Sequence, residues 1–160
     1  IAVRPGSCGP WRGNEAKQIQ IARRFQLLGM TIDGMRVWDI RRALQVLREQ
    51  CPNLKTLVLR ADPGMESLVQ LASLYEPPVS QLVLPQIVAE TALQPSILNL
   101  TRTLPLEILP VLAAQKAHIL TQTEATSAPL SSRVTADPRW QGQPIQFSAS
   151  VSLQKKCDIE

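Results

Sequence analysis

The stretch that decides the fold is "LKTLVLRADPGMESLVQLASLY", residues 54–75. It opens with a compact apolar run, the kind of segment that forms a strand buried in a parallel sheet. The chain then breaks at Pro63 and Gly64, and apolar residues recur at helical spacing over residues 64–75. The stretch therefore predicts a strand, a tight corner and a helix.

The same alternation continues on both sides of this stretch. Pro105 and Pro110 interrupt one helical segment, which predicts two or three short helices with kinks there. The further expected helices are 14–28, 35–49 and 96–115, and the further expected strands are the β-prone run before Pro5, 80–85, 117–122 and 144–153.

The last of these strands, "PIQFSASVSL" (144–153), alternates strictly between apolar and polar residues, which predicts a strand with one wet face at an edge of the sheet. A Ser/Thr-rich loop is expected before it, over residues 121–137.

Strands separated by helices indicate right-handed crossovers onto a mostly parallel sheet. We therefore expect an α/β fold, a three-layer α/β/α domain with helices on both faces of the sheet. A chain of 160 residues fits one domain, residues 1–160. Because it begins with Ile1 and not Met, we expect the domain to be a segment of a longer protein or a processed product.

The net charge of +4 is unevenly spread, since residues 1–60 hold eleven Lys and Arg against four Asp and Glu. One interpretation is a module that binds an anion or nucleic acid through the basic helix 35–49. Opposite charges lie beside these arginines, with Asp39 placed to pair with Arg42, and aromatic residues are few. A solvated helix face is therefore favoured, and nucleic acid is not the expected partner. The arginines concerned are Arg36, Arg41, Arg42 and Arg48.

Other chemistry has little support in the sequence. Three widely spaced cysteines and one histidine do not form a zinc motif, and no phosphate-binding loop is present, so no cofactor or metal is expected. No apolar run approaches the roughly 20 residues of a membrane span. Trp38 lies beside the apolar stripe of its helix and is expected to serve packing.

Two segments resemble a known family. "RRFQLLGMTIDGMRVWDIRRALQVLRE" (23–49) resembles the region before the nucleophile in α/β-hydrolase-fold proteins of the acetyl xylan esterase-like family, and "GMESLVQLASLYEPPVSQLVL" (64–84) resembles the helix and strand that follow it. Two further segments, "VRPGSCGP" (3–10) and "LPLEILPVLAAQKAHIL" (104–120), resemble a loop upstream and the following helix and strand, so the similarity covers most of residues 1–125. It implies an incomplete α/β-hydrolase-like domain, in a secreted or envelope-associated protein, whose substrate would be a polysaccharide ester.

The nucleophile of that family does not carry over. Its elbow needs G-x-S-x-G, because a tight turn must present the serine. Aligned on the helix start, Gly64 stands at the position of the serine and has no side chain with which to attack. Asp62 and Glu66 replace the small flanking residues.

Three residues are weak catalytic candidates. Ser67 falls three residues into the helix that begins at Gly64, and His118 is the only histidine, at the start of an apolar strand. Glu124 lies just past that strand, where the acid of the triad would sit, but no histidine follows it. Without such a histidine a Ser–His–acid cycle cannot run. Cys8, in a glycine-rich loop, is expected to be an ordinary loop cysteine.

The sequence thus favours an α/β-hydrolase-like domain related to acetyl xylan esterases and other carboxylesterases, without a complete triad. It would act as a structural or binding domain for other domains of the same protein or for a polysaccharide ester. One alternative is an active carboxylesterase whose catalytic groups lie outside this segment. The other is the anion- or nucleic-acid-binding module based on residues 35–49.

Overall fold

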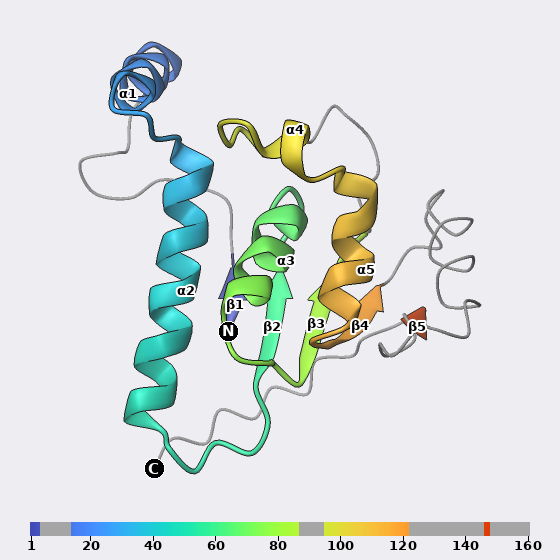
Figure 1. The fold of residues 1–160 in the computed structure, drawn as a ribbon. Helices are drawn as coiled ribbons and strands as arrows, with labels where there is room; N and C mark the ends of the chain where they lie inside the picture. Colours follow the sequence, from blue (N-terminus) through green and yellow to red (C-terminus); the bar gives the residue numbers. More distant parts are fainter. Residues whose placement is uncertain (4–13, 87–94, 122–145, 148–160) are drawn as a thin grey trace.

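The structure, a computed structural model, describes residues 1–3, 14–86, 95–121 and 146–147. Within these residues five strands form one sheet in the order β1-β2-β3-β4-β5, and every neighbouring pair is parallel (Figure 1). The strands are β1 (Ala2–Val3), β2 (Val58–Ala61), β3 (Gln81–Leu84), β4 (His118–Thr121) and β5 (Gln146–Phe147). A parallel sheet whose strands alternate with helices confirms the predicted α/β class.

The helices fall where the periodicity places them. Pro105 precedes a short 3-10 helix, and Pro110 lies in the first turn of the helix after it, so the proline-interrupted segment does form short helices. The helices are α1 (Glu15–Leu27), α2 (Ile32–Gln50), α3 (Glu66–Tyr75), α4 (Leu100–Thr103), the 3-10 helix η3 (Leu106–Ile108) and α5 (Leu109–Ala114).

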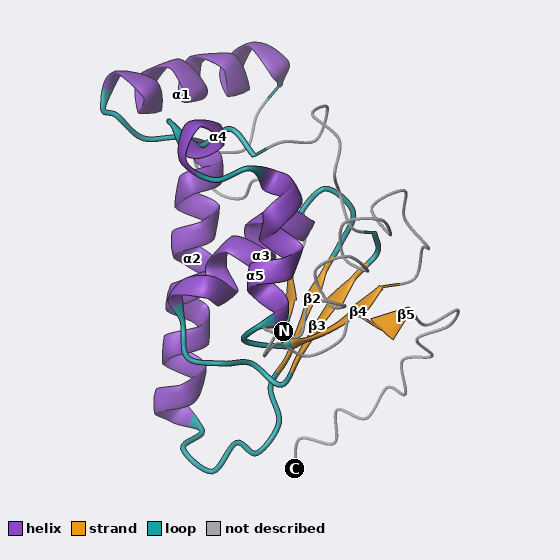
Figure 2. Ribbon diagram, turned by 45° about the vertical axis from the view of Figure 1, so that its right-hand side comes forward, coloured by secondary structure: helices purple, strands orange, loops and turns teal. Residues whose placement is uncertain are grey.

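Helices α2, α3 and α5 lie on one face of the sheet, whereas α1 lies beyond the first turn of α2, away from the sheet (Figure 2). The strand order explains this arrangement, because consecutive strands are always neighbours and advance in one direction. Right-handed crossovers that all advance the same way place their helices on the same face. Helices on both faces need a reversal of the strand order, and the described strands contain none. These helices therefore form one layer, and the described residues do not test the second layer that the sequence predicts.

The core lies between the sheet and this helical layer. Leu59, Leu82 and Ile119 are neighbours in register on three strands, and all three are fully buried. Almost the whole of α3 is buried, since it packs against α2, α5 and the sheet. The α/β unit is thus organised around α3.

A sharp corner joins α1 to α2. After α1 the chain turns at Gly29, whose φ of 71° lies in the left-handed region that glycine adopts easily. The Met30 N–H donates to the Phe25 carbonyl at 2.9 Å, which closes the end of α1. Thr31 then caps α2, because its hydroxyl accepts from the Gly34 N–H at 3.1 Å. These contacts set the position at which α2 begins.

Candidate functional site

The corner between β2 and α3 is present, and it lacks a nucleophile. Gly64 has a φ of 84°, and the Met65 N–H donates to the Asp62 carbonyl at 3.0 Å to close the turn. Among the described residues other than Gly64 and its two chain neighbours, no atom lies within 4 Å of the place where a Gly64 side chain would begin. The position that the resemblance assigns to the serine is therefore open backbone with no attacking atom.

Ser67 and His118 do not come together. Ser67 is buried in the first turn of α3, which starts from the carboxyl end of β2. His118 is the first residue of β4 and pairs in register with Gln81, the first residue of β3, so it lies at the amino end of the sheet. Four-residue strands separate the two ends by roughly 10 Å. The described candidates therefore cannot form a Ser–His pair.

The remaining catalytic candidates lie elsewhere. Glu66, one of the two carboxylates flanking the elbow position, is buried, and its Oε1 atom has no hydrogen-bond partner in the part of the chain that the structure describes. The Oε1 atom of Gln70, one turn further along α3, is also buried and unpartnered. Glu124 and Cys8 lie outside the described residues, so the structure does not place them.

The four arginines of the basic helix are all engaged within the chain, and Arg42 does not pair with Asp39 as expected. The Arg42 guanidinium lies 5.8 Å from the centre of the Trp38 ring. Only Arg36 and Arg41 pair with carboxylates, whereas the partners of Arg42 and Arg48 are neutral oxygens. The partners are Asp33 for Arg36 (3.0 Å), Glu76 for Arg41 (2.8 Å), Gln45 for Arg42 (2.7 Å) and the Pro77 carbonyl for Arg48 (2.7 Å).

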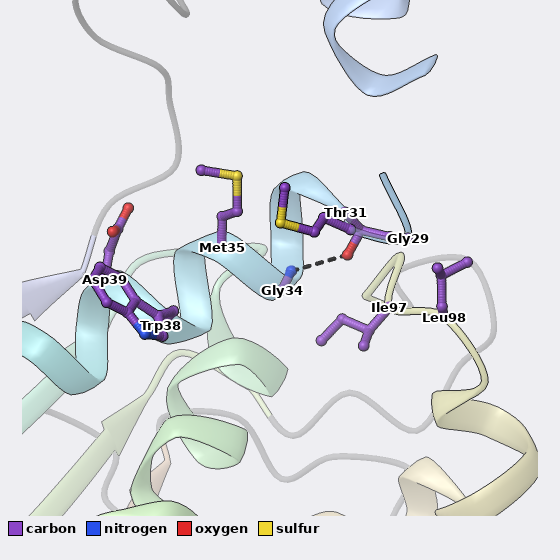
Figure 3. A pocket seen from close by; sticks show the side chains of 9 residues that line it. Gly29, Thr31, Gly34, Met35, Trp38, Asp39, Ile97 and Leu98 are labelled. Carbon is purple, nitrogen blue, oxygen red and sulfur yellow. Dashed lines mark hydrogen bonds between the residues drawn. The ribbon is translucent and has the colours of Figure 1, made fainter. Parts of the chain in front are cut away.

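A groove of about 540 Å³ lies between the first turns of α2 and the segment before α4 (Figure 3). Thr31, Gly34 and Trp38 follow one another at three and four residues, so one stripe of α2 forms one wall. Gly34 contributes no side chain to this wall. The lining residues are Gly29, Met30, Thr31, Gly34, Met35, Trp38, Asp39, Ile97 and Leu98.

The surface of this groove is mostly apolar and open to solvent. Trp38 is 58% exposed and Leu98 is 52% exposed, and Met30 is also exposed. The sequence predicts that Trp38 serves packing. That prediction is wrong, because most of its surface is open to solvent. Asp39 is the one charged residue among the lining residues, and it is exposed.

Sequence reasoning did not identify the groove. The signal available was "GMTIDGM" (29–35), in which a glycine precedes a methionine twice within seven residues. In the sequence alone, these two glycines indicate only breaks in the chain. The glycines line a groove together with Met30 and Met35. The other side of that groove is formed by Ile97 and Leu98, which are distant in sequence.

Comparison of the chain with models of known protein families, with curated proteins and with solved structures found no match. Among the described helices, none combines the length and the apolar character that a membrane crossing requires. The described residues also contain no group of three or more His, Cys, Asp or Glu that could hold a metal ion. The fold and site thus define an α/β protein with one described helical layer and an apolar surface groove.

Proposed function

We propose that this chain is a non-catalytic α/β domain that acts by binding a partner in the groove between α2 and residues 97–98. The observation that carries the proposal is the exposure of Met30, Trp38 and Leu98 in the lining of one hollow. Exposed apolar side chains gathered at one place mark binding sites more often than chance, because water disfavours them.

Kinship with the acetyl xylan esterase-like proteins is part of this proposal. The parallel sheet and the glycine corner after β2 support it. The three-layer arrangement of a hydrolase stays a prediction, since the described helices form one layer. A complete triad is not part of the proposal, because Gly64 carries no side chain and Ser67 lies far from His118.

The catalytic half of the proposal is tested by incubating the chain with a serine-directed fluorophosphonate probe and with aryl acetates. We expect no labelled serine and no turnover above buffer. Labelling of any serine together with turnover well above buffer would favour the active carboxylesterase instead.

The binding half is tested with Nile red, a neutral apolar dye whose fluorescence rises on leaving water. We expect the native chain to enhance its fluorescence, and Leu98→Glu to remove most of that enhancement, since a carboxylate then lies in the groove wall. Leu54→Glu is the matched control, because Leu54 is also exposed but does not line the groove. Equal enhancement by both variants would show that the dye binds elsewhere.

A further inference from the structure

We propose that the occupant of the groove is an amphipathic α-helix of a partner protein, with aliphatic side chains on one face and a lysine or arginine placed to reach Asp39. This inference rests on the proposed function and names the class of partner.

The origin of the lining residues points to recognition through side chains. They come from α2, from the corner before it and from residues 97–98, and none belongs to a strand. Addition of a partner strand needs an exposed sheet edge, which the groove does not offer. A helix satisfies its own backbone and presents only side chains, so it suits such a groove.

The dimensions of the groove agree with a helix. The wall runs from the N-cap Thr31 to Trp38, a distance of seven steps along the helix, which at about 1.5 Å per step is roughly 10 Å. A partner helix displays anchors at positions i, i+4 and i+7 over the same length. Met30 and Met35 add unbranched side chains that adjust to the shape of the anchors.

The volume of about 540 Å³ would also suit a small molecule. The exposed residues beyond the groove decide between the two. Leu27 and Leu28 immediately precede Gly29 and are 87% and 70% exposed. A small molecule inside the groove would leave them in water, whereas a partner helix longer than the groove offers further apolar surface to residues next to it.

The charge on the partner follows from Asp39. No cation in the described part of the chain lies within ion-pair distance of its carboxylate, and Arg42, one turn further along α2, bonds to Gln45 instead. A partner lysine or arginine gains an ion pair there. A partner carboxylate would be repelled, so Asp39 selects the sign of the partner's charge.

The test uses two fluorescein-labelled synthetic peptides with the same helical leucine face, one with lysine and one with glutamate at the flanking positions. Fluorescence anisotropy measures their binding to the intact chain. We expect the lysine peptide to bind about two- to five-fold more tightly, the range of one exposed ion pair. Asp39→Lys should reverse the order of the two peptides. Leu98→Glu should weaken both by about tenfold or more, and Leu54→Glu should leave both unchanged.

The possible failures are distinguishable. If neither peptide binds while Nile red still binds the native chain and not Leu98→Glu, the helical partner is wrong and the proposed function stands. If Nile red does not bind either, both are wrong. Equal affinity for the two peptides would overturn the role of Asp39. Thermal unfolding followed by circular dichroism confirms that each variant is folded.

Discussion

The Arg41 Nε atom lies 2.8 Å from the Glu76 Oε1 atom and joins the middle of α2 to the residue that follows α3. The Glu76 side chain is only 3% exposed, and the Gln45 amide donates to the same oxygen at 2.9 Å. Arg41 also lies over the Tyr75 ring, 5.2 Å from its centre. This cluster holds α2, which forms one wall of the groove, against the core.

Replacing Arg41 by Ala should therefore destabilise the fold. The change leaves the buried Glu76 carboxylate with the Gln45 amide as its hydrogen-bond donor. We expect a loss of about 1–3 kcal/mol, at the lower end for a broken buried pair because Arg41 is one-third exposed. Urea unfolding measures the loss. Arg42→Ala on the exposed side of α2 is the control and should cost less than about 1 kcal/mol. Equal losses in the two variants would show that the Arg41–Glu76 ion pair contributes no more to stability than the exposed contacts of Arg42.

The buried amide of Gln70 predicts a stabilising substitution. Its Oε1 atom has no hydrogen-bond partner among the described residues, so Gln70→Met, which keeps the size of the side chain, should raise the free energy of unfolding by about 1 kcal/mol. Gln45→Met is the matched control and should lower it by a similar amount, because Gln45 donates to Glu76. A destabilised Gln70→Met variant would mean that the amide has a partner, such as a buried water.

A side chain added at Gly64 should strain the backbone without causing a steric clash. The φ of 84° at this position is costly for a residue with a side chain, while the surrounding space is open, so Gly64→Ala should cost about 1–2 kcal/mol. Gly64→Asn should cost less, since asparagine tolerates this backbone region. Thermal or urea unfolding checks both.

Gly64→Ser tests the elbow directly. The variant installs a hydroxyl where the resemblance places the nucleophile, but His118 lies at the other end of the sheet and cannot accept its proton. We expect aryl acetate turnover to stay at the level of buffer. Turnover that rises in Gly64→Ser above the native chain would mean that a base lies near this corner.

Removing the side chain that caps α2 should also lower the stability of the fold. Thr31→Ala removes the hydroxyl that accepts from the Gly34 N–H and should cost about 1 kcal/mol. Asn14 caps α1 in the same way, but α1 buries only Ile21, so Asn14→Ala should have a smaller effect on global unfolding. Similar losses in the two variants would mean that α1 is bound to the core as firmly as α2.

Much of the fold could be predicted because it depends on local patterns. The helix expected over 35–49 forms as Ile32–Gln50, and only its start was missed, because Thr31 caps it before the first apolar residue of the stripe. Of the edge strand expected over 144–153, the structure describes Gln146–Phe147. These two residues pair with β4 and form the edge of the sheet. Residues 148–153 and the Ser/Thr-rich loop lie outside the described residues.

The number of helical layers could not be predicted in the same way. It depends on the order of strands in space, and hydrophobic spacing does not encode that order. The groove was missed for a similar reason, because Trp38 reads as a packing residue on its helix and only the position of Leu98 shows that it borders a hollow. The absence of a nucleophile at Gly64 was readable directly, since it depends on residue identity alone.

The most direct test of the groove uses the three methionines of the chain. Met30 and Met35 line the groove, whereas Met65 is buried at the corner between β2 and α3. Methionine methyl groups labelled for NMR report on all three as Nile red or the lysine peptide is added. We predict that the Met30 and Met35 signals move while the Met65 signal stays in place. Movement of Met65 alone would put the binding site at the glycine corner and contradict the account.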